Sequence, residues 1–150
     1  MTILPKEPWT LIRLAVDDLI KCEESENYII DMNYWHIPKR SENLCVVCMA
    51  GSVIAMTLNR GINENVSLGN IEDENCNQIR AIDCFRIGNI YGGLMMLGMK
   101  REAQVESRYD RIVNHGRMLP PCYGSQKDLF KMKMLILAEY LEAQYKARFD

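Results

Sequence analysis

The longest uncharged stretch of the chain, residues 44–59, limits most strongly what the chain can fold into. It reads LCVVCMAGSVIAMTLN and contains no Asp, Glu, Lys or Arg. At this length a helix is favoured over a strand, and a helix that is apolar on all sides is a buried one. Ser41 or Asn43 can cap its start and Gly61 can end it. We therefore expect a buried central helix over about residues 44–59.

Three other segments have the spacing of amphipathic helices. Apolar residues recur every three or four positions in residues 9–24, in residues 75–97 and from Ser125 onwards, which places them along one side of a helix. Gly88 is expected to bend or break the second segment. Ser125 and Asp128 have the spacing of a capping box at the start of the last helix.

The remaining segments are expected to be less regular. Residues 27–40 are rich in β-branched and aromatic residues, so we expect a connection there with one short strand near residues 28–35. A polar loop is expected over residues 61–75, and a short helix within residues 102–114. The prediction is one mostly helical domain over residues 1–150, with four to six helices around the central one.

Composition narrows the classes of function. The chain has 150 residues, 18 basic and 20 acidic, and a formal net charge of −2. A protein that binds nucleic acid nonspecifically needs a basic surface, so this role is not expected. No apolar run approaches the ~18 residues that a membrane-spanning helix requires. We therefore expect neither membrane insertion nor nonspecific nucleic-acid binding.

Cysteine and methionine are abundant, with six and ten residues respectively. Residues 1–9 lack the basic segment followed by an apolar one that marks a secretory signal. We therefore expect a reducing, cytoplasmic setting in which the thiols stay free and pack as small apolar groups. Methionines fill irregular gaps in cores and also line adaptable binding surfaces, and core packing is the favoured interpretation here.

His36, Cys45 and Cys48 are the candidate metal ligands. Two thiols and an imidazole at this spacing resemble a zinc site, and nucleobase deaminases use such a set. Ile37 and Pro38 stand where a deaminase would place its general-acid Glu, and no Pro precedes Cys45. Buried structural thiols are therefore preferred, with a zinc enzyme kept as an alternative. A redox pair of thiols is disfavoured because Val46 and Val47 give apolar surroundings instead of an electropositive, partly exposed setting. His36 as a general base lacks an evident partner nucleophile.

A second group of residues suits binding. Arginines and tyrosines gather late in the chain, and such combinations are common at protein interfaces. The arginines also suit an anion such as a phosphate. With the aromatic Trp35 and its neighbour, the candidate partner- or ligand-binding residues are Trp35, His36, Arg101, Arg108, Tyr109, Arg111, Arg117 and Tyr123.

Two short segments carry a family resemblance. Residues 31–36 read DMNYWH and residues 45–55 read CVVCMAGSVIA. Together they resemble a family of small bacteriophage proteins of unassigned activity, which a looser match at residues 83–88 extends. The resemblance implies a phage or prophage origin and a place in the host bacterial cytoplasm. It assigns no catalytic residues.

These observations lead to three hypotheses. The first is a noncatalytic phage accessory protein that binds a host protein, and that acts against a host defence system. The second is a nucleotide-binding protein in which Trp35 stacks on a base and arginines hold phosphate. The third is the zinc enzyme that uses His36, Cys45 and Cys48. The first two need no cofactor, and a homo-oligomer is compatible with each.

Overall fold

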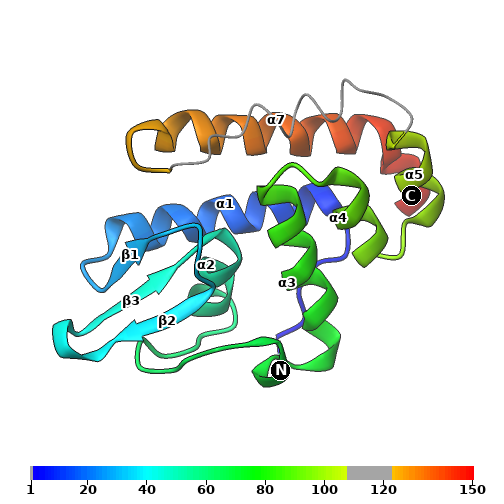
Figure 1. The fold of residues 1–150 in the computed structure, drawn as a ribbon. Coiled ribbons are helices and arrows are strands. Elements are labelled where there is room, and N and C mark those ends of the chain that lie inside the picture. Colours follow the sequence, from blue (N-terminus) through cyan, green and yellow to red (C-terminus); the bar gives the residue numbers. More distant parts are fainter. Residues whose placement is uncertain (1, 108–122) are drawn as a thin grey trace.

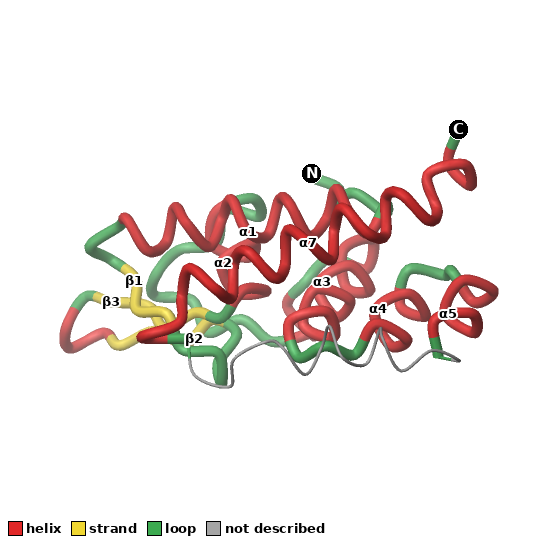
Figure 2. The backbone as a smooth tube through the Cα atoms, turned by 90° about the horizontal axis from the view of Figure 1, so that it is seen from above, coloured by secondary structure: helices red, strands yellow, loops and turns green. Residues whose placement is uncertain are grey.

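Two long helices, α1 (Pro8–Glu24) and α7 (Lys127–Tyr145), lie side by side and run in opposite directions along one side of the molecule (Figure 1). The computed structural model describes residues 2–107 and 123–150. In Figure 1 a small sheet lies beneath one end of α1, and the shorter helices of the second half of the chain lie beneath and beside its other end; the view from above shows the same division along the molecule (Figure 2). The expected mostly helical class is confirmed, with a small sheet added to it.

The sheet has three strands, β1 (Tyr28–Ile30), β2 (His36–Lys39) and β3 (Leu44–Val47). Strand β3 is central, parallel to β1 and antiparallel to β2. Helix α2 (Met49–Met56) begins two residues after β3 and packs against α1 and α3.

The predicted single helix over residues 44–59 is therefore wrong. Its residues are buried from Cys45 to Ala55, but they form β3 and then the short helix α2. A strand with both faces buried reads as a continuous apolar run, which the sequence pattern does not separate from a buried helix. Cys48 lies at the boundary, and its sulfur accepts a hydrogen bond from the Gly51 amide (3.4 Å). Neither predicted cap acts on α2.

The second half of the chain forms shorter helices. These are α3 (Asp73–Arg86), α4 (Ile90–Met96) and α5 (Lys100–Glu106). The break expected at Gly88 is confirmed, because this residue has a φ of 82° between α3 and α4. The expected helix within residues 102–114 corresponds to α5 in its first part, and the rest lies outside the described residues.

Single turns of 3-10 helix complete the fold. Their bounds are Arg40–Glu42, Leu68–Asn70, Gly124–Gln126 and Lys146–Phe149. The third of them precedes α7, so the capping box predicted at Ser125 and Asp128 is wrong. The residue before α7 is Gln126, which makes no side-chain cap bond. The single strand expected near residues 28–35 is β1, and the sequence did not indicate β2.

The core has two parts. The main part joins α1, α2, α3, α4 and α7 around large side chains such as Phe85 and Phe130. A smaller part lies between the sheet and the end of α1, and it consists of Cys22, Cys45, Val47 and Ala55. The five cysteines in the described residues are free thiols. No helix in residues 2–107 and 123–150 has the length and apolar character to span a membrane.

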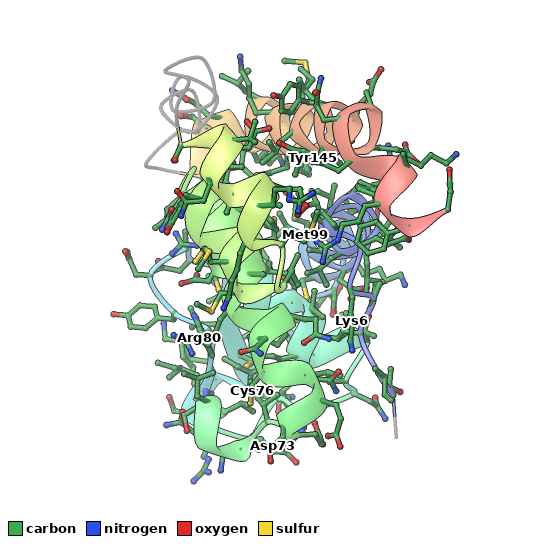
Figure 3. The ribbon with its side chains drawn as sticks, turned by 90° about the vertical axis from the view of Figure 1, so that its right-hand side faces the viewer. Lys6, Asp73, Cys76, Arg80, Met99 and Tyr145 are labelled. Carbon is green, nitrogen blue, oxygen red and sulfur yellow. The ribbon has the colours of Figure 1, made fainter. Side chains whose placement is uncertain are left out.

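At the end of the molecule opposite the sheet, a buried carboxylate holds α5 and α7 together. Glu106, in the last turn of α5, accepts hydrogen bonds from the hydroxyls of Tyr140 (3.1 Å) and Tyr145 of α7. Figure 3 shows this end of the molecule, with Tyr145 and Met99 labelled. These bonds attach α5 to α7 across the core.

A second buried carboxylate joins α1 to α2 and gives the first prediction. Asp18 is almost fully buried, and its Oδ2 accepts a hydrogen bond from the Thr57 hydroxyl at 2.5 Å. Burial raises the pKa of Asp18. We expect Thr57→Val to reduce the free energy of unfolding by about 2 kcal/mol, because the carboxylate loses a donor that water does not replace. Urea denaturation at pH 7 measures this.

Thr57→Ser is the control, since it keeps the hydroxyl. It should retain most of the stability that the valine variant loses. A loss in Thr57→Ser with unchanged stability of Thr57→Val, which keeps the methyl group, would mean that methyl packing, and not the hydrogen bond, matters at this position.

Candidate partner-binding groove

An open groove lies between the segment that leads into β2 and the loop that follows residue 64. It has a volume of about 500 Å3. Among the residues that the structure describes, its lining carries no charged side chain and consists of Asn33, Tyr34, Trp35, His36, Ile37, Asn65, Val66, Ser67, Leu68 and Gly69. Three of these, Tyr34, Ile37 and Leu68, are large apolar or aromatic side chains that are 37% to 45% exposed. Exposed apolar side chains gathered on one surface are typical of a binding site.

The first wall of the groove is held by a turn and by α2. Asp31 accepts hydrogen bonds from two backbone amides, that of Asn33 through its side chain (3.0 Å) and that of Tyr34 through its carbonyl oxygen (3.2 Å). Trp35 packs partly into the main core, and its carbonyl group lies against Gly51. A Cβ at Gly51 would stand 1.4 Å from the Trp35 oxygen. The wall therefore depends on a glycine in α2.

The second wall is held by His36. The imidazole Nδ1 lies 2.7 Å from the Glu64 carbonyl oxygen, and a carbonyl only accepts, so Nδ1 carries the proton. The carbonyl oxygen of His36 accepts a hydrogen bond from the Val66 amide (3.2 Å). The next turn is closed by Asn70, whose side-chain oxygen accepts from the Ser67 amide (3.1 Å). His36 thus attaches the loop to the edge of the sheet.

The other side of the His36 ring meets Cys45. The sulfur lies 3.5 Å from Nδ1 and 3.6 Å from Nε2. Because Nδ1 is a donor to Glu64, Nε2 is the ring nitrogen that can accept from the thiol, and the Val46 carbonyl oxygen, 4.0 Å from the sulfur, is its other acceptor. Both residues are fully buried. Burial raises the pKa of the Cys45 thiol to about 11 and lowers the pKa of His36, although the bond to Glu64 acts in the opposite direction.

This pair has the residue types of a cysteine nucleophile and its base, but not the required state. An activated cysteine is a thiolate in an accessible, electropositive setting. Burial of Cys45 and His36 favours the neutral thiol and the neutral imidazole. The pair therefore acts as a hydrogen-bonded support beneath the groove.

The three candidate zinc ligands are not brought together. Cys45 belongs to the smaller core cluster, whereas Cys48 belongs to the main one, where its sulfur accepts from the Gly51 amide. Among the described residues, no three His, Cys, Asp or Glu side chains are placed to hold a metal ion. The zinc alternative thus gains no support from His36, Cys45 and Cys48.

The other candidate binding residues lie elsewhere. Arg101 lines a separate pocket at the start of α5 with Lys100 and Arg148. Tyr123 is a core residue that meets Phe130 edge to face, with ring centres 5.4 Å apart. Arg108, Tyr109, Arg111 and Arg117 lie outside the described residues. Of the predicted residues that the structure describes, Trp35 and His36 line the groove, and Arg101 and Tyr123 do not.

Sequence reasoning missed most of the groove. Leu68 is an apolar residue in a polar loop, and Tyr34 and Ile37 flank the predicted pair. The sequence does not show that these side chains are exposed, because their exposure depends on how His36 holds the loop over residues 64–66. A single sequence does not show this long-range bond.

Comparison of the chain with protein-family models, with curated proteins and with solved structures gave no significant match.

Proposed function

We propose that this chain is a noncatalytic, phage-encoded accessory protein that binds a host protein through the groove, in the cytoplasm of the bacterium. The observation that carries this proposal is the exposure of Tyr34, Ile37 and Leu68 around an uncharged depression. Aromatic and aliphatic side chains that fill or line such a depression are the usual anchors of protein interfaces. Interference with a host defence system is the role that we propose for this binding.

The chemistry of the groove favours a protein segment over a nucleotide. Phosphate groups are recognised by Arg, Lys or a helix N-terminus, and in residues 2–107 and 123–150 neither Arg nor Lys lines the groove. Arg101, which the nucleotide hypothesis pairs with Trp35, lines a different pocket. Asn33, Asn65 and Ser67 offer neutral hydrogen-bonding groups instead. A partner with an apolar anchor and a few backbone hydrogen bonds fits this lining.

Gly69 offers a clean test of the groove. It lines the groove, and nothing lies within 4 Å of where its Cβ would stand. Gly69→Arg therefore places a long charged side chain at the groove without a clash. We expect the variant to fold normally and to lose at least tenfold in partner affinity, because a charge is moved against an apolar anchor. The measurement is capture from host lysate, identification of the partner by mass spectrometry, and titration of the purified partner.

Gly61→Arg is the matched control. Gly61 also has nothing within 4 Å of its Cβ position, and it does not line the groove. This variant should bind the partner as the unaltered protein does. The proposal is wrong if both arginine variants bind the partner equally well. It is also wrong if the unaltered protein captures no partner, or only partners that Gly69→Arg captures as well.

A further inference from the structure

The outward side of α7 carries a stripe of exposed apolar side chains. It consists of Leu129, Met132, Leu135 and Ile136, which are between 38% and 49% exposed. Figure 1 shows α7 at the edge of the molecule, with α1 on its inner side. Four exposed apolar side chains on one helix exceed what scattered surface residues explain.

The spacing of the exposed residues is that of a helix pair. Positions 129, 132, 136, 139 and 143 are all exposed and follow the three-and-four alternation of a coiled-coil seam. The buried positions of α7 lie on the opposite side of the helix, and they are Phe130, Met134, Leu137, Ala138 and Leu141. The helix thus has two apolar sides, and only one of them is covered by the described chain.

The charges of α7 are distributed unequally along its length. The first half holds three lysines and one aspartate, and the second half holds Glu139 and Glu142 with no basic residue. Lys131 and Glu142 also pair within the chain, with Glu23 and Arg13. Because Lys131 and Glu142 pair with α1 on the covered side, the charges beside the stripe are Lys133 and Glu139. Two such helices packed antiparallel about Ile136 place Lys133 of one copy opposite Glu139 of the other, whereas a parallel arrangement places like charges together.

We infer that the apolar stripe of α7 is a homodimer interface, in which two copies of the chain pack their α7 helices antiparallel about a twofold axis near Ile136. Two residues then face one another when their residue numbers add up to twice 136, so Leu129 of one copy lies opposite Ala143 of the other. The pairing covers the stripe of both copies at once. A second copy of the chain is favoured over a different protein because the charges of α7 complement those of another α7 helix.

The oligomeric state tests this directly. The apolar centre is small, so we expect a dissociation constant of roughly 10 µM. Sedimentation velocity from about 2 to about 200 µM should show a monomer–dimer equilibrium. Met132→Glu with Ile136→Glu should abolish the dimer with an unchanged thermal midpoint, because both side chains face solvent in the monomer. Ile87→Glu, at an exposed isoleucine off the stripe, should dimerise normally.

Cysteine cross-linking tests the direction of packing. Under oxidation Ile136→Cys should give a disulfide-linked dimer. Leu129→Cys and Ala143→Cys should each form no disulfide-linked dimer alone and should cross-link to one another when mixed. A monomer at all concentrations, or a dimer that survives the double glutamate change, overturns the inference. Cross-linking of Leu129→Cys to itself overturns the antiparallel arrangement. The unaltered protein, oxidised in parallel, reports any linkage through its own thiols.

Discussion

Gly51→Ala is expected to lower the free energy of unfolding by at least about 3 kcal/mol, more than overpacking of an ordinary core position costs. The added Cβ would lie 1.4 Å from the Trp35 carbonyl oxygen and 2.5 Å from its carbon. Both are backbone atoms, so no side-chain rotation relieves the clash. Either α2 or the segment before β2 must move, and each is packed in the core. Thermal unfolding should show a midpoint lowered by about 10 °C.

Gly61→Ala is the control for this change, because no atom lies within 4 Å of its Cβ position. Its midpoint should stay within about 2 °C of that of the unaltered protein. The Gly51→Ala protein that remains folded should also bind the groove partner weakly, since the wall that carries Tyr34 and Trp35 rests on Gly51. Normal stability of Gly51→Ala would show that the close approach of α2 to Trp35 is wrong.

Alkaline pH is expected to destabilise the protein strongly. Burial raises the pKa values of Cys22, Cys45 and Cys48 from 9.0 to about 11 each. The folded protein thus holds these protons more tightly than the unfolded chain does. Stability is complete below pH 9 and is lost as pH rises above it. A tenfold change in proton affinity is worth 1.36 kcal/mol, so the three thiols together remove about 4 kcal/mol at pH 10.

The measurement is urea denaturation at several pH values between 7.5 and about 10.5 with a reductant present, a range set by the expected loss above pH 9. Cys45→Ala isolates one thiol: it should remove about a third of the decline with pH, whatever it costs at pH 7.5. Cys76, which is only partly buried, supplies the comparison through Cys76→Ser, which should leave most of the decline. A free energy of unfolding that stays constant up to pH 10 would contradict the burial of these thiols.

The sequence predicted those parts of the fold that local pattern determines. The periodic stripes of α1, α3 and α7 and the break at Gly88 follow from spacing and from one glycine, which adopts a positive φ. The prediction of one helix over residues 44–59 is wrong because strand β3 is buried on both faces and leads directly into α2. No alternation of apolar and polar residues therefore marks the change from strand to helix. Cys48 gave no recognisable cap signal, since a thiol rarely serves as one.

The site was less predictable than the fold. Trp35 and His36 were selected for their chemistry and do line the groove, but His36 acts through bonds to Glu64 and Cys45 that join distant parts of the sequence. Arg101 was grouped with them because single-sequence reasoning has no measure of distance between residues 35 and 101. The structure places it on α5, in a different pocket.

The packing of α7 on α1 has a consequence for how the chain is made. Among the described helices, α1 and α7 share the most extensive contact, and α7 is synthesised long after α1. The ion pairs Arg13–Glu142 and Glu23–Lys131 join them. Until residues 127–145 have left the ribosome, the part of α1 that packs against α7 is uncovered, although α2 and α3 can already cover another part. A nascent or truncated chain therefore exposes an apolar, aggregation-prone surface that the complete protein buries. Chaperones or rapid completion of synthesis are needed to keep such a chain from aggregating.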